Sequence, residues 1–98
     1  MTEIINAEIT GTQLGFEDRG IFTFSVDLNY GGNGAQSFGG YALGKEYTNY
    51  VIKGILKTVG VDNWEDLKGK HVRVERERLG KVLKIGNLLE DNWFNPVQ

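Results

Sequence analysis

The segment at residues 21–30 constrains the fold more than any other feature, because apolar and polar side chains alternate without a break from Phe22 to Tyr30. The apolar members are every second residue: Phe22, Phe24, Val26, Leu28 and Tyr30. Successive side chains of a β-strand point to opposite faces, so this period predicts a strand with one buried face and one solvated face. The chain therefore has to form a sheet and cover its apolar face with a second layer.

A second strand is predicted upstream, because residues 5–9 alternate in the same way. The connector between the two strands contains the turn residues Gly15, Asp18 and Gly20. Two alternating segments joined by such a connector predict an antiparallel hairpin.

The glycine-rich stretch at residues 29–43 predicts a turn followed by a third strand. Residues 31–34 read GGNG, and all four tolerate the positive φ that tight turns require. The chain then returns through residues 35–43. Gly39 and Gly40 interrupt this strand, which indicates a bulge or a close approach of another backbone or aromatic ring.

The period changes at Lys45. Apolar side chains now recur at spacings of three and four, at Val51, Ile52, Ile55, Leu56 and Val59. This pattern predicts an amphipathic helix over residues 45–59, ended by Gly60. Gly54 inside the helix costs about 1 kcal/mol relative to alanine, so we expect it to permit close packing on the sheet.

The last third of the chain predicts a single helical turn and a second hairpin. Asp62 or Asn63 can cap the turn. Residues 71–78 and 81–89 form the two strands, joined across Leu79 and Gly80. We therefore expect an α+β fold in the order β-β-β-α-β-β, with an antiparallel sheet of about five strands and the helix packed on one face, against the apolar side of the strand at residues 21–30.

Length and composition indicate one soluble domain. The 98 residues suit a single α+β domain over 1–98, with residues 90–98 as a C-terminal tail. Hydrophobic residues make up 40% and charged residues 24%, close to the globular average. The absence of cysteine excludes disulfides, thiolate metal sites and cysteine nucleophiles.

The sequence also predicts where the protein acts. No stretch reaches the roughly 20 apolar residues of a membrane span, and the start MTEIINAEIT does not resemble a signal peptide. We expect a cytoplasmic protein with no membrane partner. The net charge of −2 gives no global attraction to nucleic acid, so such binding would need a local basic patch.

A phosphate-binding loop is the nucleotide motif most closely approached. Gly39, Gly44 and Lys45 match G-x-x-x-x-G-K before the predicted helix. Glu46, however, stands where the motif requires serine or threonine, and its charge would repel phosphate. We favour the structural interpretation and expect no cofactor.

Catalytic and metal-binding patterns are also weak. His71, the single histidine, has no serine or acidic relay beside it and is interpreted as a surface residue. Acidic residues occur in adjacent pairs, which usually solvate turns or begin helices: Glu17–Asp18, Glu65–Asp66 and Glu90–Asp91. The sequence predicts no catalytic residue and no metal site, and we expect the protein not to be an enzyme.

Two surface features predict binding instead. The second hairpin carries five cations that could follow a nucleic-acid backbone, although Glu75 and Glu77 interrupt them: Arg73, Arg76, Arg78, Lys81 and Lys84. Trp93 and Phe94 near the end of the chain either fold back on the core, which we favour, or insert into a partner.

Several segments together resemble a family of small proteins encoded by bacteriophages and prophages: GFEDRGIFTF at 15–24, GGYAL at 39–43, and GVDNWEDLKGKHVRVE at 60–75 followed by NWF at 92–94. The likeness covers nearly the whole chain. Residues 64–74 are also similar to a segment of some phage single-strand-binding proteins. The resemblance implies a protein that acts by binding inside an infected cell, as small acidic phage inhibitors do.

We therefore expect a non-enzymatic phage accessory protein that binds a host protein, as an anti-CRISPR-like inhibitor of a nucleic-acid-handling defence complex. The residues expected at that interface are Trp93, Phe94, Glu17, Asp18 and Tyr41. The alternative is a single-stranded nucleic-acid-binding module that uses the five cations of the second hairpin. A homodimer formed by sheet extension is a further expectation.

Overall fold

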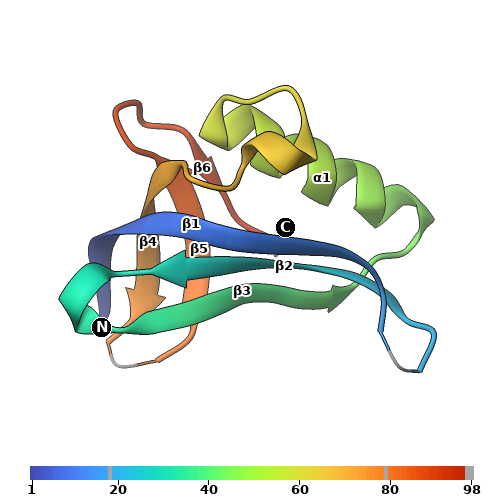
Figure 1. Ribbon diagram of the computed structural model, residues 1–98, viewed down its shortest axis with the longest axis horizontal. Helices are drawn as coiled ribbons and strands as arrows, with labels where there is room; N and C mark the ends of the chain where they lie inside the picture. Colours follow the sequence, from blue (N-terminus) through green and yellow to red (C-terminus); the bar gives the residue numbers. More distant parts are fainter. Residues whose placement is uncertain (18, 79, 97–98) are drawn as a thin grey trace.

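The structure is a computed structural model that describes residues 1–17, 19–78 and 80–96 (Figure 1). Within these residues there are six strands, one α-helix and two short 3₁₀ helices. In chain order they are β1 (Thr2–Phe16), β2 (Phe22–Asn29), η1 (Gly31–Asn33), β3 (Ala35–Ala42), α1 (Lys45–Val59), η2 (Trp64–Asp66), β4 (His71–Glu77), β5 (Val82–Asn87) and β6 (Trp93–Phe94). The fold is α+β, as the sequence predicts.

All six strands belong to one antiparallel sheet in the order β3-β2-β1-β4-β5-β6. The spatial order β4-β1-β2-β3 is a Greek key, in which the strand after the long connection returns beside the first. The long strand β1 makes this possible, since residues 2–8 pair with β4 and residues 8–16 pair with β2. A bulge between Ile9 and Gly11 lies just after the change of partner, where bulges bend and twist a strand.

The curled sheet brings its two sides together as a partly open barrel, so that β3 lies near β5. The alternation in β2 is confirmed, because Phe24, Val26 and Leu28 are buried in the core. Two helix residues, Val51 and Ile55, are buried in the same core. Figure 1 shows α1 on one side of the sheet, and the strands it contacts most are β5 and β6 rather than β2.

Two glycine predictions are confirmed. Gly54 of α1 faces Phe94 of β6, and a Cβ atom at Gly54 would lie 2.6 Å from the Phe94 ring. Gly39 has a φ of 132°, and a Cβ atom there would lie 2.4 Å from the Phe24 carbonyl oxygen. The β2–β3 register shifts at this point, which is the expected bulge. Because Gly39 to Ala42 lie in β3, a phosphate-binding loop is contradicted.

Element boundaries are confirmed for the helix, which spans Lys45–Val59 with Gly60 left-handed at a φ of 90°. The helical turn over residues 61–70 is also present, as η2, but the Asn63 side chain does not cap it and contacts Asp66 instead.

Two further details differ from the prediction, and a third lies partly outside the described residues. Gly15 lies inside β1 rather than in the turn, because β1 extends to pair with the whole of β2. The sheet has a sixth strand, since Trp93 and Phe94 of the predicted tail pair with β5. The turn predicted across Leu79 and Gly80 includes Leu79, which lies outside the described residues.

Candidate functional site

The gap between β3 and β5 is closed at one end by a polar clasp of Tyr30, Gln36, Arg76 and Gly80. The Gln36 amide donates to the Gly80 carbonyl oxygen at 2.7 Å, and its own oxygen accepts from the Tyr30 hydroxyl at 2.7 Å and from Arg76 at 3.0 Å. The Arg76 guanidinium also lies 4.8 Å from the centre of the Tyr30 ring and pairs with Glu3 at 3.2 Å. Arg76 thus holds the two sides of the sheet together.

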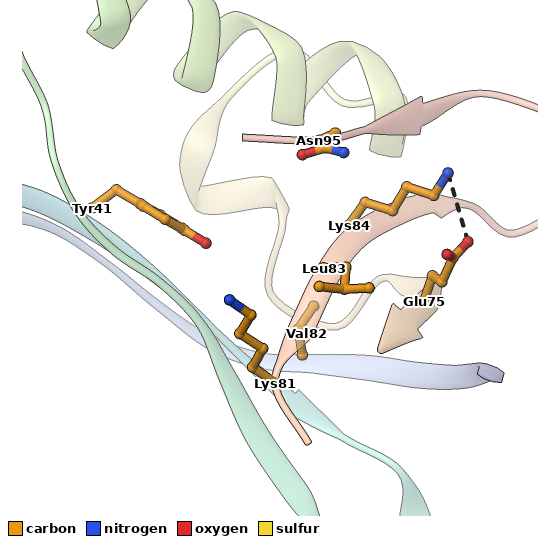
Figure 2. A pocket seen from close by; sticks show the side chains of 7 residues that line it. All are labelled: Tyr41, Glu75, Lys81, Val82, Leu83, Lys84 and Asn95. Carbon is orange, nitrogen blue, oxygen red and sulfur yellow. Dashed lines mark ion pairs between the residues drawn. The ribbon is translucent and has the colours of Figure 1, made fainter. Parts of the chain in front are cut away.

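The same gap is open farther along, where a cleft of about 240 Å³ separates β3 from β5. We call it the seam cleft. It is lined by Tyr41, Glu75, Lys81, Val82, Leu83, Lys84 and Asn95. Figure 2 shows Tyr41 on one wall and the β5 side chains on the other, with the Tyr41 hydroxyl and the Lys81 ammonium pointing toward the space between the walls.

The two lysines that line the seam cleft differ in whether they form an ion pair. Lys84 pairs with Glu75 at 3.6 Å and also lies 5.2 Å from the centre of the Trp93 ring. Lys81 is exposed, and it forms no ion pair with the described residues. Tyr41 is half-buried and stacks on Phe24 with ring centres 6.2 Å apart. The seam cleft therefore offers one phenol and one unpaired ammonium to a ligand.

A second candidate surface is the loop at residues 88–92, between β5 and β6. The Asn87 side-chain oxygen accepts hydrogen bonds from the backbone N–H groups of Leu89 and Glu90, at 2.9 and 3.0 Å. The Asn87 amide donates to the carbonyl oxygen of Thr58 in α1 at 3.0 Å. Arg73 donates to the Asn87 and Glu90 carbonyl oxygens, each at 2.8 Å. Side chains from β4 and β5 thus fix the backbone of this loop.

The side chains of the same loop point outward. Leu89 is 89% exposed and Leu88 is 39% exposed. Glu90 and Asp91 are exposed beside them, and the Asp91 carboxylate accepts a hydrogen bond from the Trp93 indole at 3.0 Å. The loop therefore displays two leucines and two carboxylates from a fixed backbone. We call these four residues the leucine loop.

The structure separates the residues predicted at a protein interface. Phe94 is 3% exposed and packs in the core, so it does not offer a surface contact. Trp93 is half-buried and covers Gly86, with the Arg73 guanidinium 4.8 Å from its ring centre. This agrees with the favoured expectation that both aromatics fold back.

Glu17 and Tyr41 lie in different places. Glu17 follows β1, where its N–H donates to the Ile21 carbonyl oxygen at 3.0 Å, whereas Tyr41 lines the seam cleft. Asp18 lies outside the described residues. The four predicted interface residues that the structure describes do not form one site.

The five cations of the second hairpin also differ in whether internal contacts hold them or they are exposed to a ligand. Arg73 and Arg76 are engaged by internal hydrogen bonds, and Lys84 by Glu75. Arg78 and Lys81 are exposed. Only part of the predicted basic surface is therefore open to a ligand.

Sequence reasoning missed the leucine loop. Two adjacent leucines after Asn87 were assigned to the end of a strand, because a run of apolar residues matches a strand as well as a loop. The signal that could have found it is Asn87 itself, since asparagine side chains often hydrogen-bond to backbone N–H groups two or three residues ahead.

The described residues contain no group of three or more potential metal ligands. Within the same residues, no helix is long and apolar enough to cross a membrane. Comparisons of the chain with protein-family models, curated proteins and solved structures gave no match.

Proposed function

We propose that this is a non-enzymatic binding protein that engages another protein through the leucine loop. The observation that supports this most directly is Leu89, which is 89% exposed on a backbone fixed by Asn87 and Arg73. Ordering a loop on binding costs free energy, and a loop that is already fixed avoids much of that cost. An apolar side chain displayed in this way favours insertion into a partner's pocket.

The charges beside the leucines favour a partner of a particular kind. Glu90 and Asp91 lie next to Leu89 in the chain and are exposed. Carboxylates at the rim of an interface favour basic residues on the partner and repel acidic ones. We therefore infer a partner with an apolar pocket bordered by lysine or arginine.

Proteins that handle nucleic acid carry basic surfaces of this kind. Together with the resemblance to phage-encoded proteins, this supports a host nucleic-acid-handling protein as the partner and inhibition, as by anti-CRISPR proteins, as the outcome. A homodimer would instead use the sheet edges at β3 and β6, and β6 offers only two residues for pairing.

The experiment places a photo-crosslinking amino acid at position 89 and exposes the protein to nuclease-treated lysate of a bacterial host. The crosslinked protein is identified, purified and titrated with the wild type and with Leu89→Ala. Burying one leucine contributes about 1.5–3 kcal/mol, so Leu89→Ala should weaken binding by about 10-fold or more.

Phe16→Ala is the matched control, because Phe16 is 71% exposed at the far end of β1. It should leave the affinity within about twofold. Equal losses from Leu89→Ala and Phe16→Ala, or no loss from Leu89→Ala, would contradict the leucine loop as the interface.

A further inference from the structure

The seam cleft lies in a kind of barrel that is often used for ligand binding. Partly open Greek-key barrels of five strands, such as the OB-fold, bind oligonucleotides or oligosaccharides on the face of their second and third strands. Here the outward residues of β2 and β3 include Thr23, Ser25, Asp27 and Ser37. The Asp27 carboxylate accepts a hydrogen bond from Ser37 at 3.0 Å. That face carries neither a cation nor an aromatic ring, so it does not suit a polyanion.

The required side chains lie instead around β5, on β3, on β5 itself, on β6 and on the residue before β5. Tyr41 and Lys81 face each other across the seam cleft (Figure 2). Lys84 lies three residues after Lys81, in β5, and reaches toward Trp93, whose ring covers Gly86. Two lysines, Lys81 and Lys84, therefore lie between the Tyr41 ring in the seam cleft and the Trp93 ring in β6. A positively charged groove with aromatic rings is the arrangement that holds a single strand without reading its sequence.

The geometry points to a binding site for single-stranded nucleic acid that begins in the seam cleft and follows β5 to Trp93. Its phosphates contact Lys81 and Lys84, with Arg78 from the preceding turn, and a base stacks on Tyr41. The path from Lys81 to Gly86 covers about 16 Å of chain, which suits the lower end of the roughly 4–16 nucleotides that one OB-fold binds.

The acidic neighbours limit how tightly this site binds. Glu75 lines the seam cleft and already pairs with Lys84. About three phosphate contacts give a slope of about −2 for the logarithm of the binding constant against the logarithm of the salt concentration. Affinity should therefore fall about 20-fold between about 50 and 200 mM salt, within the roughly 1–100 µM range of non-specific nucleic-acid binding.

The test is fluorescence anisotropy with labelled oligo(dT) and oligo(U) of about 20 nucleotides, and with a DNA duplex of the same length. The two single strands distinguish DNA from RNA, and each should bind better than the duplex. Lys81→Gln removes one contact, which should weaken binding about eightfold at about 50 mM salt and reduce the slope by about 0.7.

Two further variants separate this site from general attraction. Lys68→Gln is the matched control, because Lys68 is exposed between η2 and β4 and does not line the seam cleft. It should leave binding within about twofold. Tyr41→Leu should weaken binding by about 5-fold or more through lost base stacking, while leaving the slope unchanged.

No anisotropy change at about 200 µM protein and about 50 mM salt would overturn the proposal, as would equal effects of Lys81→Gln and Lys68→Gln. Preference for the duplex would also overturn it. Thermal unfolding of each variant shows whether it is folded. The Lys81→Gln result decides the matter if Tyr41→Leu is unstable, since Lys81 is an exposed residue.

Discussion

The outer faces of the two halves of the sheet carry different kinds of side chain, although both halves belong to one continuous sheet. On β1, β2 and β3 the outward side chains are mostly small and uncharged. On β4, β5 and β6 they include Arg73, Glu75, Lys84 and Trp93.

Each half of the sheet also contains a glycine at which an added Cβ atom would clash with a neighbouring group. Gly39 adjoins the β2 backbone, whereas Gly86 adjoins the Trp93 ring. In the first half glycine serves sheet curvature, and in the second it makes room for a surface aromatic.

Replacing Gly39 tests the first half and should have the largest effect. Gly39→Ala places a Cβ atom 2.4 Å from the Phe24 carbonyl oxygen, at a φ of 132°. Strained φ and overpacking cost about 1–3 kcal/mol each, so the free energy of unfolding should fall by about 4 kcal/mol. Urea denaturation measures this loss.

Gly40→Ala is the control for Gly39→Ala. Gly40 has a φ of 82°, but no atom lies within 4 Å of a Cβ placed there. It should lose only the conformational part, about 1 kcal/mol. Equal losses in the two variants would show that conformation, and not the close approach of β2, determines the cost.

Replacing Asn87 tests whether the second half holds the leucine loop rigidly. Asn87→Ala removes the acceptor for two N–H groups and the donor to Thr58. Three hydrogen bonds at about 1 kcal/mol each predict a loss of about 3 kcal/mol in the free energy of unfolding.

Hydrogen exchange of the Leu89 and Glu90 amides should accelerate in Asn87→Ala. Leu89→Ala, by contrast, should change stability by less than about 0.5 kcal/mol, because its side chain is exposed. Unchanged exchange of the two amides would mean that Arg73 alone holds the loop.

Replacing Gly86 should have a smaller effect than replacing Gly39, because a side chain can move where a backbone cannot. Gly86→Ala brings a Cβ atom within 2.5 Å of the Trp93 ring. The ring should swing outward, with a loss of about 1–2 kcal/mol. Tryptophan emission in a Trp64→Phe background reports Trp93 alone, and it should shift to longer wavelength. An unshifted spectrum would contradict this account of the second half.

The sequence predicted local structure well where one pattern determines it. The hydrophobic period predicts the strand β2 and the helix over residues 45–59. The tolerance of glycine for positive φ predicts the bulge at Gly39. The division of β1 between two partners was not predictable, because a residue pattern does not specify which strands meet. β6 was missed for a different reason, because two residues are too few to show a period.

The candidate sites were harder to predict, because they depend on which side chains neutralise one another. Arg73 and Arg76 match a basic patch in the sequence, yet the structure shows them bonded to carbonyl and amide oxygens. Lys81 was in the same predicted set and remains open. Tyr41 and Lys81 face one cleft only because β3 and β5 meet through the Greek key, forty residues apart in the chain.

The smallest predicted effect concerns the polar clasp, where the two halves meet. Burial raises the pKa of Tyr30, and the nearby Arg76 partly offsets this by lowering it. A tyrosine whose pKa is higher in the folded state stabilises the fold fully below its unfolded pKa of about 10. That stabilisation is lost as the pH rises through the folded pKa. The free energy of unfolding should therefore be insensitive to Tyr30 from pH 7 to 9, and should decline above about pH 10.

Tyr30→Phe isolates this contribution from that of other groups. Burial also raises the pKa of Tyr47, so the variant should keep part of the alkaline decline and lose the part that belongs to Tyr30. Urea denaturation of wild type and Tyr30→Phe across this range gives the difference. Arg76→Met should steepen the decline, because it removes the charge that lowers the Tyr30 pKa. Parallel losses of stability in wild type and Tyr30→Phe would mean that the pKa of Tyr30 does not change on unfolding. The two halves would then be joined by packing rather than by this polar cluster.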